Sequence, residues 1–155
     1  MDRKPTPELN SEYSTGIPGI DNQHSELFFM CNVLLKNLVK ENHPPDAAYL
    51  SAQDIMRNLK NHCSTEEYLL DMVGFPKTPD HKIQHKKIFK TLNKELKAIK
   101  NSKGSDVSRF VRTFRDSLRT HISDADSEYA IHVKNLIFLR NKYNITALKA
   151  QVLVE

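Results

Sequence analysis

Five of the seven histidines in this chain recur at spacings that suit metal binding together with two carboxylates. His62 is followed four residues later by Glu66, and His81 is followed four residues later by His85. Residues four apart on an α-helix lie only about 40° apart around the axis, so each pair projects two donor groups from one face. The set is completed by His24, His121 and Asp126.

The donor set indicates a pair of metal ions. Buried imidazoles and carboxylates are costly without compensation, and seven ligands are too many for one ion. Imidazole with carboxylate suits iron, zinc, copper or nickel, whereas structural zinc sites use four ligands and usually cysteine. Two bridging carboxylates, five nitrogens and an oxo or hydroxo bridge suit two irons. If the histidines divide three and two, one iron has six ligands and the other five, which leaves a position for a small molecule.

A histidine taken alone is more often a core residue bonded to a neighbouring backbone group. We give that role, or an exposed position, to His43 in a proline-rich loop and to His132 near the C-terminus.

Composition favours a single soluble helical domain. The chain has 155 residues, is 39% apolar and 27% charged, and contains four glycines and no tryptophan. No apolar run approaches a membrane span, and the start lacks the apolar core of a signal peptide, so we expect a cytoplasmic location. The net charge of +4 comes from lysines mixed with acidic residues, which favours a solvated surface over nucleic-acid binding.

Four segments carry apolar residues at three- and four-residue spacing, as amphipathic helices do. We expect helices over about 21–40, 46–73, 80–100 (or from 78) and 106–129. Asp21 is placed to cap the first, Gly74 and Pro76 end the second, and Gly104 ends the third. The candidate ligands fall within the apolar stripes, so their side chains should point inward.

Four such helices joined by short links predict an all-α protein, an antiparallel up-down four-helix bundle. Residues 1–19 hold three prolines and are expected to form an N-terminal arm. The bundle itself is assigned to 20–130 and a C-terminal helical extension to 131–155.

The extension has its own apolar pattern. We expect the fourth helix to continue past Tyr129 and to break near Asn144. The segment that follows should pack on its own bundle or against a second copy, forming a homodimer, because an exposed apolar face is unfavourable in a soluble monomer. The apolar positions concerned are Leu136, Leu139, Tyr143, Ile145, Leu148, Val152 and Leu153.

The ordered motifs resemble the hemerythrin family over residues 13–130. The match begins with Gly16-Ile17-Pro18 through Asp21 and Gln23-His24, followed by Leu27-Phe28. It continues through His62 with Glu66-Glu67, Phe75-Pro76, His81, His85, Phe89, His121-Ile122, Asp126 and Tyr129. The resemblance implies the same bundle fold and includes every candidate ligand.

The resemblance also implies a role for each ligand. His81, His85 and His121 are similar to the triad of a six-coordinate iron. His24 and His62 are similar to the ligands of an iron with an open position, and Glu66 and Asp126 to the carboxylates that bridge the two. The family binds O₂ reversibly at the open iron, which implies oxygen storage, delivery or sensing and no catalytic residues. Di-iron oxygenases have four carboxylates and two histidines instead.

Asp126 departs from the expected helical spacing. It lies five residues after His121, about 140° away on an ideal α-helix, whereas Asp124 at three residues is nearer in angle. Spacing alone favours Asp124 and the resemblance favours Asp126. A local widening of the helix, or a different side-chain reach, would reconcile the two, with Asp124 then facing solvent.

Two positions depart from the family pattern near the small-molecule pocket. The residue after the second-helix histidine is commonly aromatic and is Cys63 here, and a common tryptophan is replaced by Ser117. Both resemble pocket-lining positions, as does Leu118, which keeps its apolar character. The loss of bulk predicts a larger and wetter pocket.

Several functions therefore remain open. The first is a protein that binds O₂ or another small diatomic or anionic ligand. The alternative is a di-iron enzyme with peroxidase or nitric oxide- and nitrite-handling activity, favoured by a larger pocket near a thiol. A third is a zinc-containing or empty structural site.

The two cysteines are expected to stay reduced and unpaired. If His24 and His62 lie at one level, Cys31 is roughly 10 Å along its helix from that level, while Cys63 is adjacent to it. A disulfide requires Cα atoms within about 7 Å.

Overall fold

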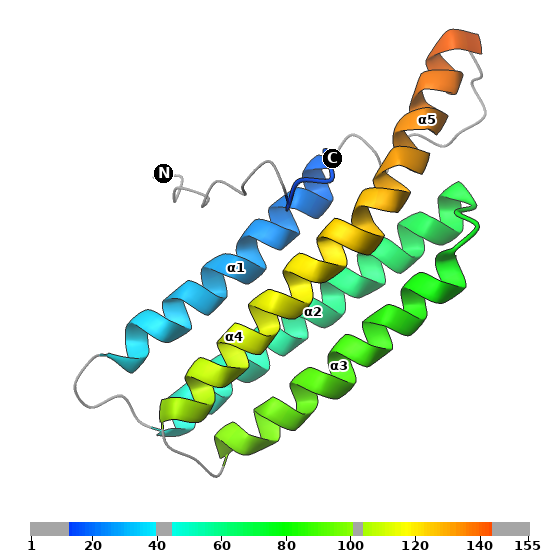
Figure 1. Ribbon diagram of the computed structural model, residues 1–155. Coiled ribbons are helices and arrows are strands. Elements are labelled where there is room, and N and C mark those ends of the chain that lie inside the picture. The colour runs from blue at the N-terminus through cyan, green and yellow to red at the C-terminus, as the bar shows by residue number, and fades with distance from the viewer. Residues whose placement is uncertain (1–12, 40–44, 101–103, 144–155) are drawn as a thin grey trace, which may run out of the picture.

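A computed structural model describes residues 13–39, 45–100 and 104–143, and Figure 1 shows them as a set of long helices. The elements are α1 (Pro18–Leu38), α2 (Pro45–Val73), α3 (Thr78–Lys100), α4 (Gly104–His121), the π-helical segment η2 (Ile122–Asp126) and α5 (Ser127–Tyr143). Helices α1 to α4 lie side by side, and α1 contacts both α2 and α4 while α3 contacts α2 and α4. The all-α four-helix bundle predicted from the sequence is confirmed. Within the described residues, no helix is long and apolar enough to cross a membrane.

The core divides into two apolar clusters, and the candidate ligands lie where one gives way to the other along the chain. The larger cluster, from Leu27 to Ile122, includes Leu34, Ile55 and Phe114. The smaller consists of Ile17, Ile20, Leu69, Leu70, Phe75, Tyr129, Ala130 and Val133. A polar layer lies between two dry regions, so water has little access to it from either end of the bundle.

The start of α1 is fixed by Asp21, although not as predicted. The helix begins at Pro18 with Ile17 as N-cap, so the prediction that Asp21 caps it is wrong. Asp21 lies in the first turn and reaches back, where its carboxylate accepts hydrogen bonds from the backbone N–H groups of Thr15 (2.8 Å) and Gly16 (3.0 Å). Proline is favoured at the first helical position because it needs no N–H partner there, which explains why the helix starts earlier.

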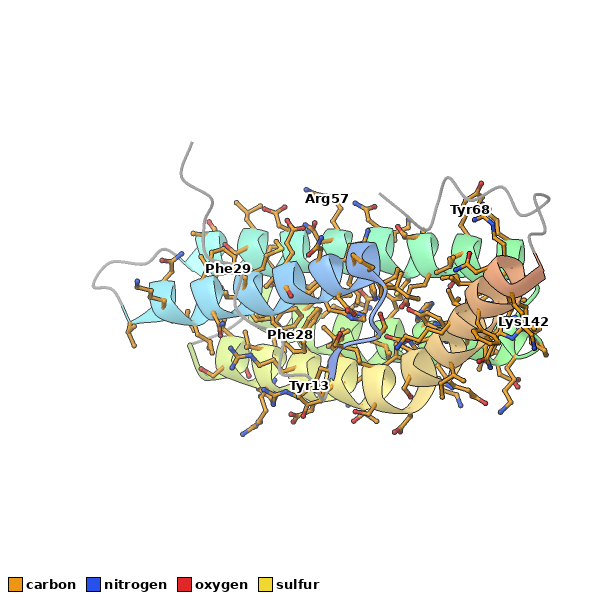
Figure 2. The ribbon with its side chains drawn as sticks, turned by 90° about the horizontal axis from the view of Figure 1, so that it is seen from above. Tyr13, Phe28, Phe29, Arg57, Tyr68 and Lys142 are labelled. Atoms are coloured by element: carbon orange, nitrogen blue, oxygen red, sulfur yellow. The ribbon has the colours of Figure 1, made fainter. Side chains whose placement is uncertain are left out.

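The turn before α1 packs onto the bundle. Gly16 has a φ of 74°, which favours glycine, and a Cβ there would lie 2.9 Å from the Lys134 amine on α5. Tyr13 and Phe28 lie close together in Figure 2, and the Arg119 guanidinium of α4 lies 5.8 Å and 5.9 Å from their ring centroids. These contacts connect the turn to both α1 and α4.

Gly74 ends α2, as predicted. Its φ is 63°, the Phe75 N–H donates to the Leu70 carbonyl at 3.0 Å, and the Gly74 N–H donates to Asp71. This is the Schellman arrangement, with Phe75 and Leu70 packed in the same apolar cluster. The tight stop lets α3 begin at Thr78, which places His81 and His85 opposite the end of α2.

The fourth helix continues past Tyr129, which confirms that part of the prediction. Through η2 it becomes α5, which extends beyond the ends of the other helices in Figure 1. The predicted break at Asn144 and the apolar positions from Ile145 to Leu153 lie outside the described residues.

Replacement of Asp21 tests the start of α1. Partial burial alone would raise the Asp21 pKa, but hydrogen bonds from Ser14, Thr15 and Gly16 lower it below its ordinary value of 3.8. The ionised carboxylate therefore adds stability above that value, and this contribution disappears as the pH falls through the lowered pKa. Because it removes the hydrogen bonds that the carboxylate accepts, we expect Asp21→Ala to lower the unfolding free energy of the metal-free protein by about 1 kcal/mol at pH 7. The difference should shrink at pH 3, as measured by urea denaturation; a difference that is equal at both pH values would contradict this.

Candidate metal centre

The seven predicted ligands come from five consecutive elements and meet in the bundle core. His24 comes from α1, His62 and Glu66 from α2, His81 and His85 from α3, His121 from the end of α4 and Asp126 from the end of η2. All seven are buried, and His24, Glu66 and Asp126 are fully enclosed. The structure brings every one of them into a single cluster.

The first group of donors consists of Glu66, His81, His85 and His121, one ligand atom of each lying within 4.8 Å of the others. The His85 Nε2 atom lies 3.1 Å from Glu66 Oε2 and 3.0 Å from His121 Nε2. His81 Nε2 lies 3.5 Å from the same Glu66 oxygen. Three imidazoles therefore point one nitrogen each toward one carboxylate oxygen.

The second group consists of His24, His62, Glu66 and Asp126, with the same close spacing. The Nε2 atoms of His24 and His62 are 3.1 Å apart, and His62 Nε2 lies 3.4 Å from Glu66 Oε2. His24 Nε2 lies 3.2 Å from Asp126 Oδ2. Glu66 belongs to both groups, and Asp126 lies between His24 and His121, so both carboxylates are positioned to connect two ions.

Asp126 reaches the cluster because the helix widens before it. Residues 122–126 form a π-helical turn, in which the Ser127 N–H donates to the carbonyl of Ile122, five residues back. A turn closed at five residues returns Asp126 toward the face of His121. Its Oδ1 atom lies 3.1 Å from His121 Nε2. Asp124 is exposed, as expected if Asp126 is the ligand. The local widening anticipated from the sequence is confirmed.

The donor set fits a cation. Both Asp126 oxygens are buried and accept no hydrogen bond from the described residues, although ring nitrogens lie within 3.2 Å. Two Nε2 atoms that face each other at about 3 Å share at most one proton, so part of this cluster is uncompensated without another positive charge. Nitrogen and carboxylate donors at this spacing suit a transition metal.

The surroundings of these side chains shift their pKa values, and two of the shifts favour metal binding. Burial lowers the His62 pKa to about 4, against the opposing effect of Glu66, so its imidazole is neutral at pH 7. Burial works to raise the pKa of Glu66, but His62 and hydrogen bonds from His81 and His85 hold it well below its usual range. Burial also opposes a charge on His85, yet its contacts with Cys63 and Glu66 raise its pKa to about 11. A bound metal ion would replace that proton.

Three further residues lie within hydrogen-bond distance of candidate ligands without belonging to the donor groups themselves. The sequence analysis gave them no role. The buried Tyr129 hydroxyl donates to Glu66 Oε1 at 2.5 Å. Gln23 Oε1 lies 3.0 Å from His62 Nδ1, and Glu67 Oε1 lies 2.9 Å from His85 Nδ1. Each lies next to a ligand in sequence or three residues after one, which is the signal that could have identified them.

The predicted pocket residues do not share one cavity among the described residues. Ser117 lines a hollow of about 450 Å³ between α3 and α4 that reaches His121 and also borders Gln84 and Thr120. Cys63 and Leu118 lie in the apolar core instead. The Cys63 thiol is hydrogen-bonded to His85, and burial raises its pKa. The two departures from the family pattern thus lie near the three-histidine group.

Comparison with known proteins identifies relatives of this chain. The sequence profile of the hemerythrin HHE cation binding domain matches residues 15–130. A protein named bacteriohemerythrin from Clostridium acetobutylicum is 30% identical over 126 residues, which cover 76% of this chain and 94% of that relative. The matched profile spans all seven convergent side chains.

The two carboxylates provide the sharpest test of the ligand set. We expect Glu66→Ala and Asp126→Ala each to lose metal, because each removes a donor that faces both groups. Metal at a free concentration of a thousand times its Kd adds about 4 kcal/mol to the free energy of unfolding. Loss of the metal should therefore lower the thermal midpoint of both variants. Asp124→Ala is the control and should keep both metal and midpoint. Metal analysis that shows loss in the Asp124 variant would mean that the wrong aspartate was assigned.

The thiols are expected to be free but unreactive in the folded protein. Cys31 and Cys63 are unpaired and buried, which confirms the prediction that they form no disulfide. Burial raises the Cys31 pKa to about 12, although Arg115 opposes this, so little thiolate is present at pH 8. A chromogenic disulfide reagent should detect two thiols per chain after denaturation and almost none before. Rapid reaction of native protein would contradict the burial.

Proposed function

Because this chain belongs to the hemerythrin family of HHE cation-binding domains, we propose that its buried cluster holds two iron ions and binds O₂ reversibly. The observation that carries the proposal is the division of the donors into two groups that share Glu66. One group has three imidazoles and the other has two, as expected for one filled and one open coordination sphere. Seven donors with only two carboxylates favour oxygen binding over oxygenation.

In this proposal His81, His85 and His121 would hold one iron, and His24 and His62 would hold the other. Glu66 and Asp126 would supply carboxylate oxygens to both. Two irons would supply the electrons that reversible O₂ binding requires.

The protein's own contribution is to keep His62 neutral, to orient Glu66 and to limit the access of water to the ligands. The lowered pKa of His62 leaves its imidazole available to a metal. Tyr129 has a pKa raised well above its usual range by burial and by Glu66 and Asp126, so it stays protonated and fixes Glu66 as an acceptor. The apolar clusters on either side exclude water, which protects a bound ligand from protons.

The alternative is an enzyme that handles peroxide, nitric oxide or nitrite. The hollow beside His121 and Ser117 favours it, because a route from solvent to a metal ligand would admit water or a second reactant. We place it second because the Cys63 thiol is buried and protonated, which makes it a poor nucleophile or reductant.

Iron content and oxygen response test the proposed function directly. We expect aerobically purified protein to contain about two irons per chain, as two-metal sites do. After anaerobic reduction, admission of air should produce oxo-bridged charge-transfer absorption that disappears again under nitrogen. One zinc per chain, or absorption that never reverses, would contradict reversible oxygen binding. Accelerated turnover of peroxide or nitrite with a reductant would instead support the enzyme.

We also propose the division into an arm (1–19), a bundle (20–130) and an extension (131–155) that contacts a second copy. On α5, Ile131 and Phe138 are each more than 60% exposed, and at seven residues apart they lie on one face of the helix, where they could form a shared apolar patch. We expect the native protein to be dimeric by light scattering and Ile131→Lys with Phe138→Lys to be monomeric. Exposed Tyr68 on α2, changed to Lys, is the control. A monomeric native protein would exclude this interface.

A further inference from the structure

Two candidate ligands, one from each metal group, have side-chain partners of different charge behind them. His85, in the three-histidine group, has the carboxylate of Glu67 at 2.9 Å from its Nδ1 atom. His62, in the two-histidine group, has the amide oxygen of Gln23 at 3.0 Å from its Nδ1 atom. In contrast, the Nδ1 atoms of His24 and His121 are buried without a hydrogen-bond partner among the described residues.

Both partners fix the same tautomer. An ionised carboxylate can only accept a hydrogen bond, so His85 Nδ1 carries a proton that points to Glu67, and release of the Nε2 proton would leave a lone pair that faces Glu66 and His121. For Gln23, the orientation follows from Thr65, whose hydroxyl donates to the Asn61 carbonyl at 3.0 Å and therefore accepts from Gln23 Nε2. The Gln23 oxygen is then left to accept from His62.

We propose that Glu67 and Gln23 are positioning residues that make the two metal positions unequal, with Glu67 tightening the three-histidine position and Gln23 leaving the two-histidine position weaker. The proposal rests on the di-iron function proposed above and deepens it. A charged acceptor behind an imidazole increases the electron density at the opposite nitrogen, whereas a neutral amide orients the ring with a smaller effect. The Glu67 side chain is 33% exposed, so solvent reduces its effect without removing it.

The inequality has a functional consequence. The ion with two imidazoles would have fewer protein donors and so a position for a ligand, and a weaker donor set would leave that ion better able to accept and release it. The three imidazoles, one of them backed by a carboxylate, would hold the other ion in place. Glu67 and Gln23 therefore add to the inequality that the division into three and two histidines already creates.

The test exchanges the two partners and measures metal affinity with Co²⁺ alone, under anaerobic conditions and without O₂. The variants are Glu67→Gln, Gln23→Glu and the two combined. Glu26→Gln on α1 and Gln53→Glu on α2 are matched charge controls, since Glu26 is exposed and Gln53 contacts Tyr49 rather than a ligand. Competition with a chelator gives the two stepwise affinities, and urea unfolding of the metal-free proteins reports any structural damage.

Loss of a hydrogen-bond partner behind a metal-bound histidine lowers affinity by about ten- to a hundredfold. Glu67→Gln keeps an accepting oxygen and removes only the charge, so we expect it to weaken the tighter step by up to about tenfold and to leave the weaker one almost unchanged. Gln23→Glu should strengthen the weaker step, a gain that damage to the fold cannot produce. In the combined variant the two affinities should converge.

Two results would separate the possible failures. If native protein binds two Co²⁺ ions but the exchanged variants match their charge controls, the positioning roles are wrong and the di-iron proposal stands. If native protein binds fewer than two ions, the two-metal cluster itself is wrong and both proposals fail.

Discussion

Two fully buried carboxylates face five imidazoles at the centre of this bundle, and the cost of burying them constrains the rest of the structure. An ionised carboxylate in a dry core is strongly unfavourable unless positive charge and hydrogen bonds surround it. Glu66 is surrounded by His62, His81, His85 and the Tyr129 hydroxyl, whereas Asp126 has ring nitrogens nearby but accepts no hydrogen bond from the described residues. The histidines turn Nε2 inward, and two of them are held from behind through Nδ1 by polar side chains. This arrangement is the one expected of residues selected to hold cations.

The π-helical turn at 122–126 is the backbone adjustment that makes the cluster possible. A regular α-helix through these residues would turn Asp126 away from His121 and bring Asp124 nearer. One wider turn corrects the angle without ending the helix, so that α5 continues and places Tyr129 against Glu66. The same adjustment therefore positions both a candidate bridge and the hydroxyl that orients the other. Such turns are rare and are found frequently at functional sites.

Much of this arrangement could be predicted from the sequence because helical spacing is regular. The four-residue separations of His62 with Glu66 and of His81 with His85 indicated shared faces, and Gly74 marked the end of α2. Asp126 could not be chosen by spacing, since the residues of η2 carry no periodic signal for a wider turn, and only the resemblance to a family selected it. Asp21 was misplaced because the residue types that favour a cap also occur within the first turn. The roles of Gln23 and Glu67 depend on contacts between helices, which no local pattern specifies.

The central claim is that the two donor groups hold two ions bridged by Glu66 and Asp126. Anomalous diffraction at the iron absorption edge, on crystals of aerobically purified protein, measures this most directly. The account predicts two iron peaks less than about 4 Å apart. His81, His85 and His121 should surround one, His24 and His62 the other, and both carboxylates should lie between them. A single peak, or two peaks without Asp126 between them, would contradict it.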